Sequence, residues 1–233
     1  MAPNPNRPPG ITSGKTFDYR HLLKGGLPTY LPVGIFIDGS LSRDPLHTSY
    51  LDVLRAGTIL GKLSTGDLYA PAIIGVLSSA YDASGTTTVM DLSVADATEL
   101  VRRIGTSGTF HISGPPSAAG TMSEYQDVTY SAVNTTTGVV TITAIAADNI
   151  AGSFIQPDDG SEVMRGLINR EDGIKVTDDD DDDIDPQCEL LVGGQLDSSQ
   201  IIRWPSNAVL VQWIKDKLNA TAAGSYLFDD LYV

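Results

Sequence analysis

The sequence contains a single cysteine, few basic residues and no long apolar run. Because Cys188 is alone, an internal disulfide and a metal site built from several thiolates are both excluded. No apolar stretch approaches the roughly 18 to 20 residues that a membrane-spanning helix needs, so we expect no membrane partner. The first ten residues, MAPNPNRPPG, lack the apolar centre of a signal peptide, so secretion by that route is not expected.

Basic residues are scarce relative to acidic ones. The chain has 15 Lys and Arg against 29 Asp and Glu, a formal net charge of −14. Affinity for nucleic acid comes largely from Lys and Arg that neutralise phosphates, so we expect no nucleic-acid partner. Hydrophobic residues make up 41% of the 233 positions, which is enough to bury a core in one large domain or two small ones.

Catalytic motifs are also absent. The three histidines lie in separate segments without the spacing of metal ligands: His21, His47 and His111. Two glycine–lysine stretches, at 10–16 and 57–62, have one residue too few between their glycines for a phosphate-binding loop. We therefore expect no enzyme and no cofactor.

Composition divides the chain into four parts. Residues 1–40 hold six prolines and six glycines, which disfavour a helix and favour an extended arm. Residues 41–92 read as the first part of a β-meander, because short apolar runs alternate there with turn-forming residues. Residues 93–158 are rich in β-forming Thr, Val, Tyr and Ile. Residues 159–233 are expected to complete the core.

The third part contains the clearest local signals. Residues 94–104 predict a short amphipathic helix, with Asp91 or Ser93 as its N-cap and two arginines in its last turn. Residues 127–133 and 139–145 alternate with period two on either side of an NTTTG turn, which predicts a β-hairpin.

The fourth part combines an acidic run with a C-terminal helix. Residues 206–219 predict a helix with Leu210, Trp213, Ile214 and Leu218 on one face. The acidic run at 178–183 has carboxylates at the first, third and fifth positions of a calcium loop: Asp178, Asp180 and Asp182. The glycine that such a loop needs at its sixth position is Asp183 here. A solvated hairpin tip is the favoured interpretation, and a looser cation site is the alternative.

Residues 55–82 contain two short motifs. AGTILGK at 56–62 is followed by a short hairpin, and AIIGVL at 72–77 precedes Tyr81 and Asp82. This pattern resembles the head-decoration proteins of lambda-like tailed bacteriophages, which sit as trimers on the outside of an expanded capsid and cement it. In that family a strand of the form V-x-G-x-V/L follows closely. Here the comparable LLVGGQL at 190–196 comes much later, so we interpret 93–158 as an insertion.

The resemblance implies a mainly β fold. It would consist of a small β-barrel or β-meander core, an inserted β-hairpin module, one short helix in the insertion and one C-terminal helix. It also implies a virion structural protein, made in the host cytoplasm and bound to the outer capsid surface. Its partners would be the major capsid protein and two further copies of itself.

The resemblance also implies two sets of site residues. The N-terminal arm would bind the capsid through its one compact apolar patch: Tyr30, Leu31, Val33, Ile35 and Phe36. An ordinary first strand of the core fits the same residues. The motif residues would form the core and the trimer contacts, because they are more apolar than one small sheet can bury: Ala56, Gly57, Thr58, Leu60, Gly61, Gly75, Val76, Leu77 and Trp204.

Two other functions remain open from the sequence. One is a different phage structural component, such as a tail, fibre or minor head protein. The other is a β-module that binds carbohydrate or another surface, for which exposed aromatic side chains are expected. The sequence has only two tryptophans, Trp204 and Trp213, and both fit a core or an interface better than a sugar site.

Overall fold

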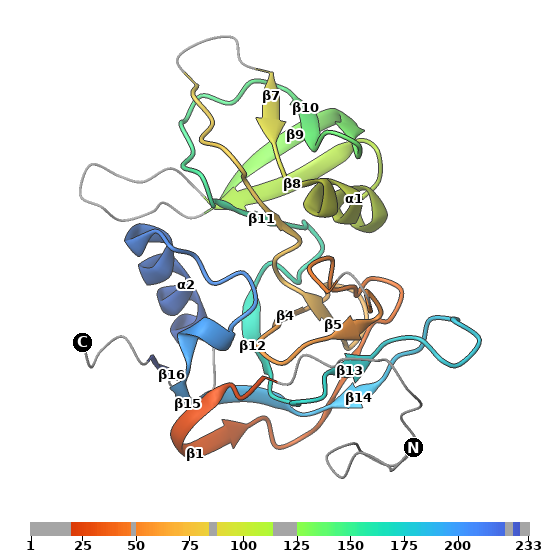
Figure 1. The fold of residues 1–233 in the computed structure, drawn as a ribbon, viewed down its shortest axis with the longest axis vertical. Helices are drawn as coiled ribbons and strands as arrows, with labels where there is room; N and C mark the ends of the chain where they lie inside the picture. Colours follow the sequence, from red (N-terminus) through yellow and green to blue (C-terminus); the bar gives the residue numbers. More distant parts are fainter. Residues whose placement is uncertain (1–19, 48–49, 84–87, 114–124, 222–225, 229–233) are drawn as a thin grey trace, which may run out of the picture.

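The computed structural model describes residues 20–47, 50–83, 88–113, 125–221 and 226–228. Strands dominate and form two large sheets (Figure 1). The α-helices are α1 (Val94–Arg103) and α2 (Ala208–Thr221), and one 3-10 turn is η1 (Ser198–Gln200). The prediction of a mainly β fold with two helices is confirmed. No helix in the described ranges is long and apolar enough to cross a membrane.

The larger sheet, which we call the core sheet, has eight strands in the order β1-β15-β12-β4-β5-β2-β14, with β16 beside β15. These strands are β1 (Leu23–Tyr30), β2 (Ile35–Ile37), β4 (Ile59–Lys62), β5 (Leu68–Pro71), β12 (Met164–Ile168), β14 (Gln187–Cys188), β15 (Leu190–Leu196) and β16 (Tyr226–Phe228). Most pairs are antiparallel, but β2 with β5 and β15 with β16 are parallel.

Each face of the core sheet carries a cluster of buried apolar side chains. Successive side chains of a strand point to opposite faces, and in β4 Ile59 enters one apolar cluster while Leu60 enters another. Helix α2 covers the first face with the side chains predicted for it: Leu210, Trp213, Ile214 and Leu218. A short pair, β3 (Val53–Leu54) with β13 (Ile174–Lys175), contributes to the second cluster.

The smaller sheet, the module sheet, has the order β6-β11-β8-β9-β10-β7. Its strands are β6 (Gly75–Val76), β7 (Val89–Asp91), β8 (Gly108–Ser113), β9 (Tyr125–Asn134), β10 (Val139–Ile142) and β11 (Phe154–Gln156). The predicted hairpin is confirmed as β9 and β10. Asn134 Oδ1 accepts the N–H groups of Thr136 and Thr137 in its turn, and Gly138 has a φ of 83°.

The module sheet begins earlier in the chain than position 93, the boundary expected from the sequence. Strands β6 and β7 pair within it, although the meander was expected to keep them with residues 41–92. Buried side chains that include Ile74 and Leu77 join its apolar cluster. The two motifs therefore lie in different sheets, since 56–62 supplies β4 of the core sheet and 72–77 leads into β6.

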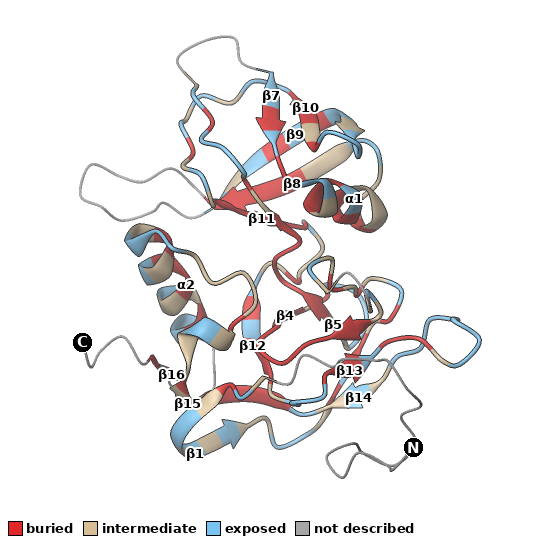
Figure 2. Ribbon diagram, viewed as in Figure 1, coloured by how far each residue is buried: buried red, intermediate tan, exposed pale blue. Residues whose placement is uncertain are grey.

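Residues 20–40 belong to the core sheet, which corrects the prediction of an arm over 1–40. Strand β1 pairs with β15, and β2 lies between β5 and β14. Leu22, Ile35 and Ile37 are buried at 1%, 5% and 0% exposure. Buried residues also run along inner strands of the core sheet such as β4 (Figure 2). Residues 1–19 of the expected arm lie outside the described residues.

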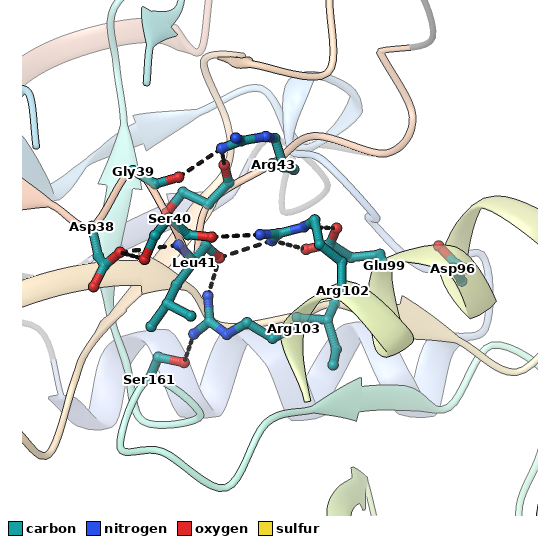
Figure 3. A network of polar contacts seen from close by, with 12 residues as sticks. Asp38, Gly39, Ser40, Leu41, Arg43, Asp96, Glu99, Arg102, Arg103 and Ser161 are labelled. Atoms are coloured by element: carbon teal, nitrogen blue, oxygen red, sulfur yellow. Dashed lines mark hydrogen bonds and ion pairs between the residues drawn. The ribbon is translucent and has the colours of Figure 1, made fainter. Parts of the chain in front are cut away.

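Helix α1 connects the module sheet to the loop that follows β2 (Figure 3). Ser93 is its N-cap, and its hydroxyl accepts the Asp96 N–H at 3.0 Å. Arg102 donates to the carbonyl oxygens of Ser40 at 2.7 Å and Leu41 at 3.0 Å, while Glu99 holds its guanidinium at 2.6 Å.

Arg103 makes the next set of contacts. Its guanidinium donates to the Leu41 carbonyl, to Asp159 at 2.8 Å and to Ser161 Oγ at 3.0 Å. Burial lowers the pKa of Arg103, and the Asp159 carboxylate opposes that shift. Because Asp159 lies in the turn between β11 and β12, this arginine joins α1 to both sheets.

A second buried ion pair lies in the first turn of α1. Arg203 Nη2 is 2.6 Å from Asp96 Oδ1 and also donates to the Ile74 carbonyl at 3.1 Å. The two side chains are only 5% and 2% exposed. Arg203 has a φ of 62°, an uncommon conformation for a residue other than glycine. Its side chain is held in this conformation by the contacts with Asp96 and the Ile74 carbonyl.

We expect Asp96→Asn to lower the free energy of unfolding by about 3–5 kcal/mol, because it leaves the buried Arg203 charge without a counter-ion. Urea unfolding followed by circular dichroism measures this. The control is Asp172→Asn, which removes an exposed pair with Arg170 and should cost about 1 kcal/mol or less. Equal losses for both variants would contradict the importance of the buried pair.

Candidate binding surface

The segment between β1 and β2 exposes apolar side chains at one end of the core sheet. Val33 is 77% exposed and Phe36 is 47% exposed, and we call these two residues the apolar ridge. The alternation of β2 explains the placement, because Ile35 and Ile37 point into the core while Phe36 points outward. Phe36 is paired with Gln187 of β14, and β14 lies at the end of the molecule away from the module sheet (Figure 1).

A groove of about 460 Å³ borders this ridge. Its other wall includes Tyr69 and the ion pair of Lys62 with Asp67, whose atoms are 2.7 Å apart. The hydrogen bond and charge of Asp67 raise the pKa of Lys62, and Lys62 lowers the pKa of Asp67 in return. The groove therefore offers apolar contact beside a solvent-exposed ion pair.

The five residues expected to anchor the arm are divided between core and surface. Ile35 is buried and its side chain packs in the core, which corrects the prediction of an anchor on an arm at that residue. Tyr30 and Leu31 are half-buried, and the Tyr30 hydroxyl accepts the Asn169 amide at 2.7 Å. Only Val33 and Phe36 are exposed.

Close backbone packing explains the glycines of the first motif. Gly57 has a φ of 87°, and a Cβ there would lie 2.2 Å from the Gln200 carbonyl oxygen. A Cβ on Gly61 would lie 1.8 Å from the carbonyl oxygen of Ser161. Arg55, just before the motif, binds both carboxylate oxygens of Asp44 at 2.6 and 3.1 Å. The glycines of the motif are thus needed for close packing within a single chain.

The motif residues expected at trimer contacts lie mostly inside the subunit. Seven are buried in this single chain: Ala56, Gly57, Thr58, Leu60, Gly61, Gly75 and Leu77. Val76 and Trp204 are half-buried, and Trp204 stacks on Phe228 with 5.2 Å between ring centroids. One chain therefore does bury this apolar content, because two sheets and α2 cover it. Their apolar content therefore gives no reason to expect trimer contacts at these residues.

The acidic run forms a hairpin tip closed by a bridge between Thr177 and Asp183. Asp178 accepts the N–H groups of Asp180 and Asp182 at 2.9 and 3.0 Å, so its carboxylate holds the turn. Asp183 pairs with Arg43 at 2.5 Å. Within the described residues, no group of three or more His, Cys, Asp or Glu side chains is arranged to hold a metal ion.

A histidine between two carboxylates is a feature that the sequence did not reveal. His111 of β8 is 5% exposed, with Nδ1 2.7 Å from Asp127 Oδ1 and Nε2 3.1 Å from Asp158 Oδ1. The contact at Nδ1 has the distance of an ion pair but not the angle of a hydrogen bond. Tyr125, 48% exposed, lies over the ring at 4.2 Å. The four residues meet only because β9 and the β11 turn flank β8.

Two adjoining clefts follow the edge strand β14, and together we call them the β14 groove. One, of about 490 Å³, is lined by Tyr30, Gly34, Asn169, Arg170 and residues 187–189. The other, of about 360 Å³, lies between residues 50–53 and 170–175 and ends at Pro186. Arg170 lines both. Gly34 lines the first cleft and also the groove beside the apolar ridge, so these surfaces are continuous.

Cys188 lies in the floor of the β14 groove as a free thiol. Burial raises the pKa of this thiol to about 12; Glu189 adds to the shift and Arg170 opposes it. The thiol is therefore protonated at neutral pH and is a poor nucleophile.

Comparisons with known proteins add no relative: no family model, no curated protein and no solved structure matches this chain.

Ile35→Ala and Val33→Ala test whether the expected anchor is part of the core. We expect Ile35→Ala to lower the free energy of unfolding by about 2–5 kcal/mol, because it leaves a cavity under β2. Val33→Ala should change it by less than about 0.5 kcal/mol, since that side chain is exposed. Denaturant unfolding measures both. A neutral Ile35→Ala would place β2 outside the core.

The raised pKa of Cys188 predicts slow alkylation of the native protein. At pH 8 a thiol with a pKa of about 12 is roughly one part in ten thousand thiolate. We expect iodoacetamide to react about a thousand-fold more slowly than with the urea-unfolded chain. The native rate should rise about tenfold per pH unit from 8 to 10, measured by intact mass. A rate that levels off near pH 8.5 would contradict the shift.

Proposed function

We propose that this protein is a virion structural protein that decorates and stabilises the outer surface of a bacteriophage capsid. The motifs in residues 55–82 and their resemblance to head-decoration proteins of lambda-like phages are the basis of the proposal. Three copies would assemble around a local three-fold position of the shell, with the major capsid protein as partner.

The apolar ridge is the observation that carries the proposal. An attachment protein needs an exposed apolar surface that a partner covers, and Val33 and Phe36 supply one beside two grooves. The module sheet lies at the other end of the molecule (Figure 1). This polarity supports attachment by one end and projection of the module outward.

Charge supports an outer position over an inner one. A net charge of −14 is repelled by packaged DNA, whereas the outer face of a shell imposes no such penalty. Attachment at several sites by a trimer would offset weak single contacts, because linked binding events reinforce one another.

Occupancy on capsids tests the proposal. We expect hundreds of wild-type copies per purified virion by quantitative mass spectrometry, and at least tenfold fewer copies of Val33→Glu or Phe36→Glu, because each places a charge in the apolar contact. Val94→Glu is the matched control: Val94 is 49% exposed but lies on α1 beside the module sheet, so its occupancy should stay at the wild-type level.

Two results would contradict the proposal. About three to twelve copies per virion would indicate a tail or portal-vertex component instead of a decoration protein. Full occupancy by the two ridge variants would mean that another surface binds the shell. Circular dichroism of each variant separates loss of binding from loss of folding.

A further inference from the structure

The β14 groove has the shape and chemistry of a site for an extended peptide. It runs beside an edge strand of the core sheet, where an added segment meets backbone as well as side chains. Tyr30 lines one cleft and Tyr50 the other, and the amide side chains of Asn169 and Gln187 lie in the first. Aromatic-lined grooves are a recurring way of holding proline-rich segments.

The charged side chains that line the groove are three carboxylates and two cations, an excess of one negative charge. Glu189 is exposed in the first cleft and makes no ion pair within the described part of the chain. Asp52 and Asp172 line the second cleft, where Arg170 and Lys175 supply the opposite charge. Arg170 is held by Asp172 at 2.9 Å, and Lys175 donates to the Asp178 carbonyl at 2.6 Å. The excess of one carboxylate over the cations favours an occupant that carries basic side chains.

The described chain begins beside this groove. His21 Nδ1 is 2.8 Å from Glu171 Oε1, and Glu171 lies between Arg170 and Asp172, which line the clefts. The nineteen residues before Arg20 are therefore attached at the edge of the groove. Residues 3–9 are 11 to 17 positions from Arg20, a reach of about 36 to 56 Å for an extended chain.

The sequence of that segment matches the groove. It contains Pro3, Pro5, Pro8 and Pro9, which favour the polyproline conformation that aromatic grooves recognise. Its charged side chains are Arg7, Lys15 and Asp18, so it is basic in a chain that is otherwise strongly acidic.

We propose that the N-terminal segment, residues 3–19, binds in the β14 groove of its own subunit. Attachment at Arg20 gives the segment an effective concentration of order millimolar at the groove, which favours its own subunit over a second copy. Because Gly34 lines both the groove and the surface beside the apolar ridge, the bound segment borders the ridge. The proposal concerns the free protein and does not depend on the proposed capsid function.

Photo-crosslinking of the full-length protein tests this. Benzoylphenylalanine is introduced at position 8, and the control carries it at position 136 in the exposed turn of the β9–β10 hairpin. After irradiation, peptide mass spectrometry identifies the joined residues. We expect position 8 to give adducts concentrated in residues 30–34, 169–175 and 186–189, and position 136 to give none there.

Two charge variants test the specificity of the adducts. Glu189→Lys in the groove and Arg7→Glu in the segment should each lower the adduct yield at least threefold. Asp216→Lys, an exposed change on α2, should leave it unchanged. Circular dichroism of each variant separates loss of the contact from loss of folding.

A mixture of isotope-labelled and unlabelled protein distinguishes the occupants. Adducts within one label confirm binding to the same subunit. Adducts between labels would overturn the proposal in favour of exchange between copies. Adducts scattered over the surface, or yields that neither charge variant changes, would also overturn it, because an unbound tether produces that pattern.

Discussion

Buried arginine–carboxylate contacts around α1 hold the two sheets of this molecule together. Asp96 and Arg203 form a pair that is almost completely removed from water, and Arg103 spans from α1 to the loop after β2 and the turn after β11. A buried charge that loses its partner is costly. These contacts therefore join the module sheet to the core sheet at α1.

The apolar ridge, the β14 groove and the His111 cluster are divided between the two ends of the molecule. The apolar ridge and the β14 groove lie at the core-sheet end, while His111 with its two carboxylates lies on the module sheet. The ion-paired junction lies between these two ends, and the chain passes between the sheets through short connections at residues 72–74 and 157–163.

Local patterns predicted much of the secondary structure. Ser93 before an apolar-periodic run, followed by arginines in the last turn, was sufficient for α1, because capping and periodicity act within one helix. The alternation on both sides of the NTTTG turn was sufficient for the β9–β10 hairpin. The spacing of four apolar residues in α2 also predicted which face of that helix is buried. In each case the interacting residues are neighbours in the chain.

The sequence alone determined the strand character, both helices, the hairpin and the acidic charge. Tertiary structure decided the partners. Period two in residues 35–37 predicts a strand, but only pairing with β5 and β14 makes it a core strand instead of an arm. Likewise, β6 and β7 joined the module sheet, and His111 met Asp158 across 47 positions of sequence. Alternation fixes which side chains share a face of a strand; pairing between distant strands follows from total burial, which no local segment specifies.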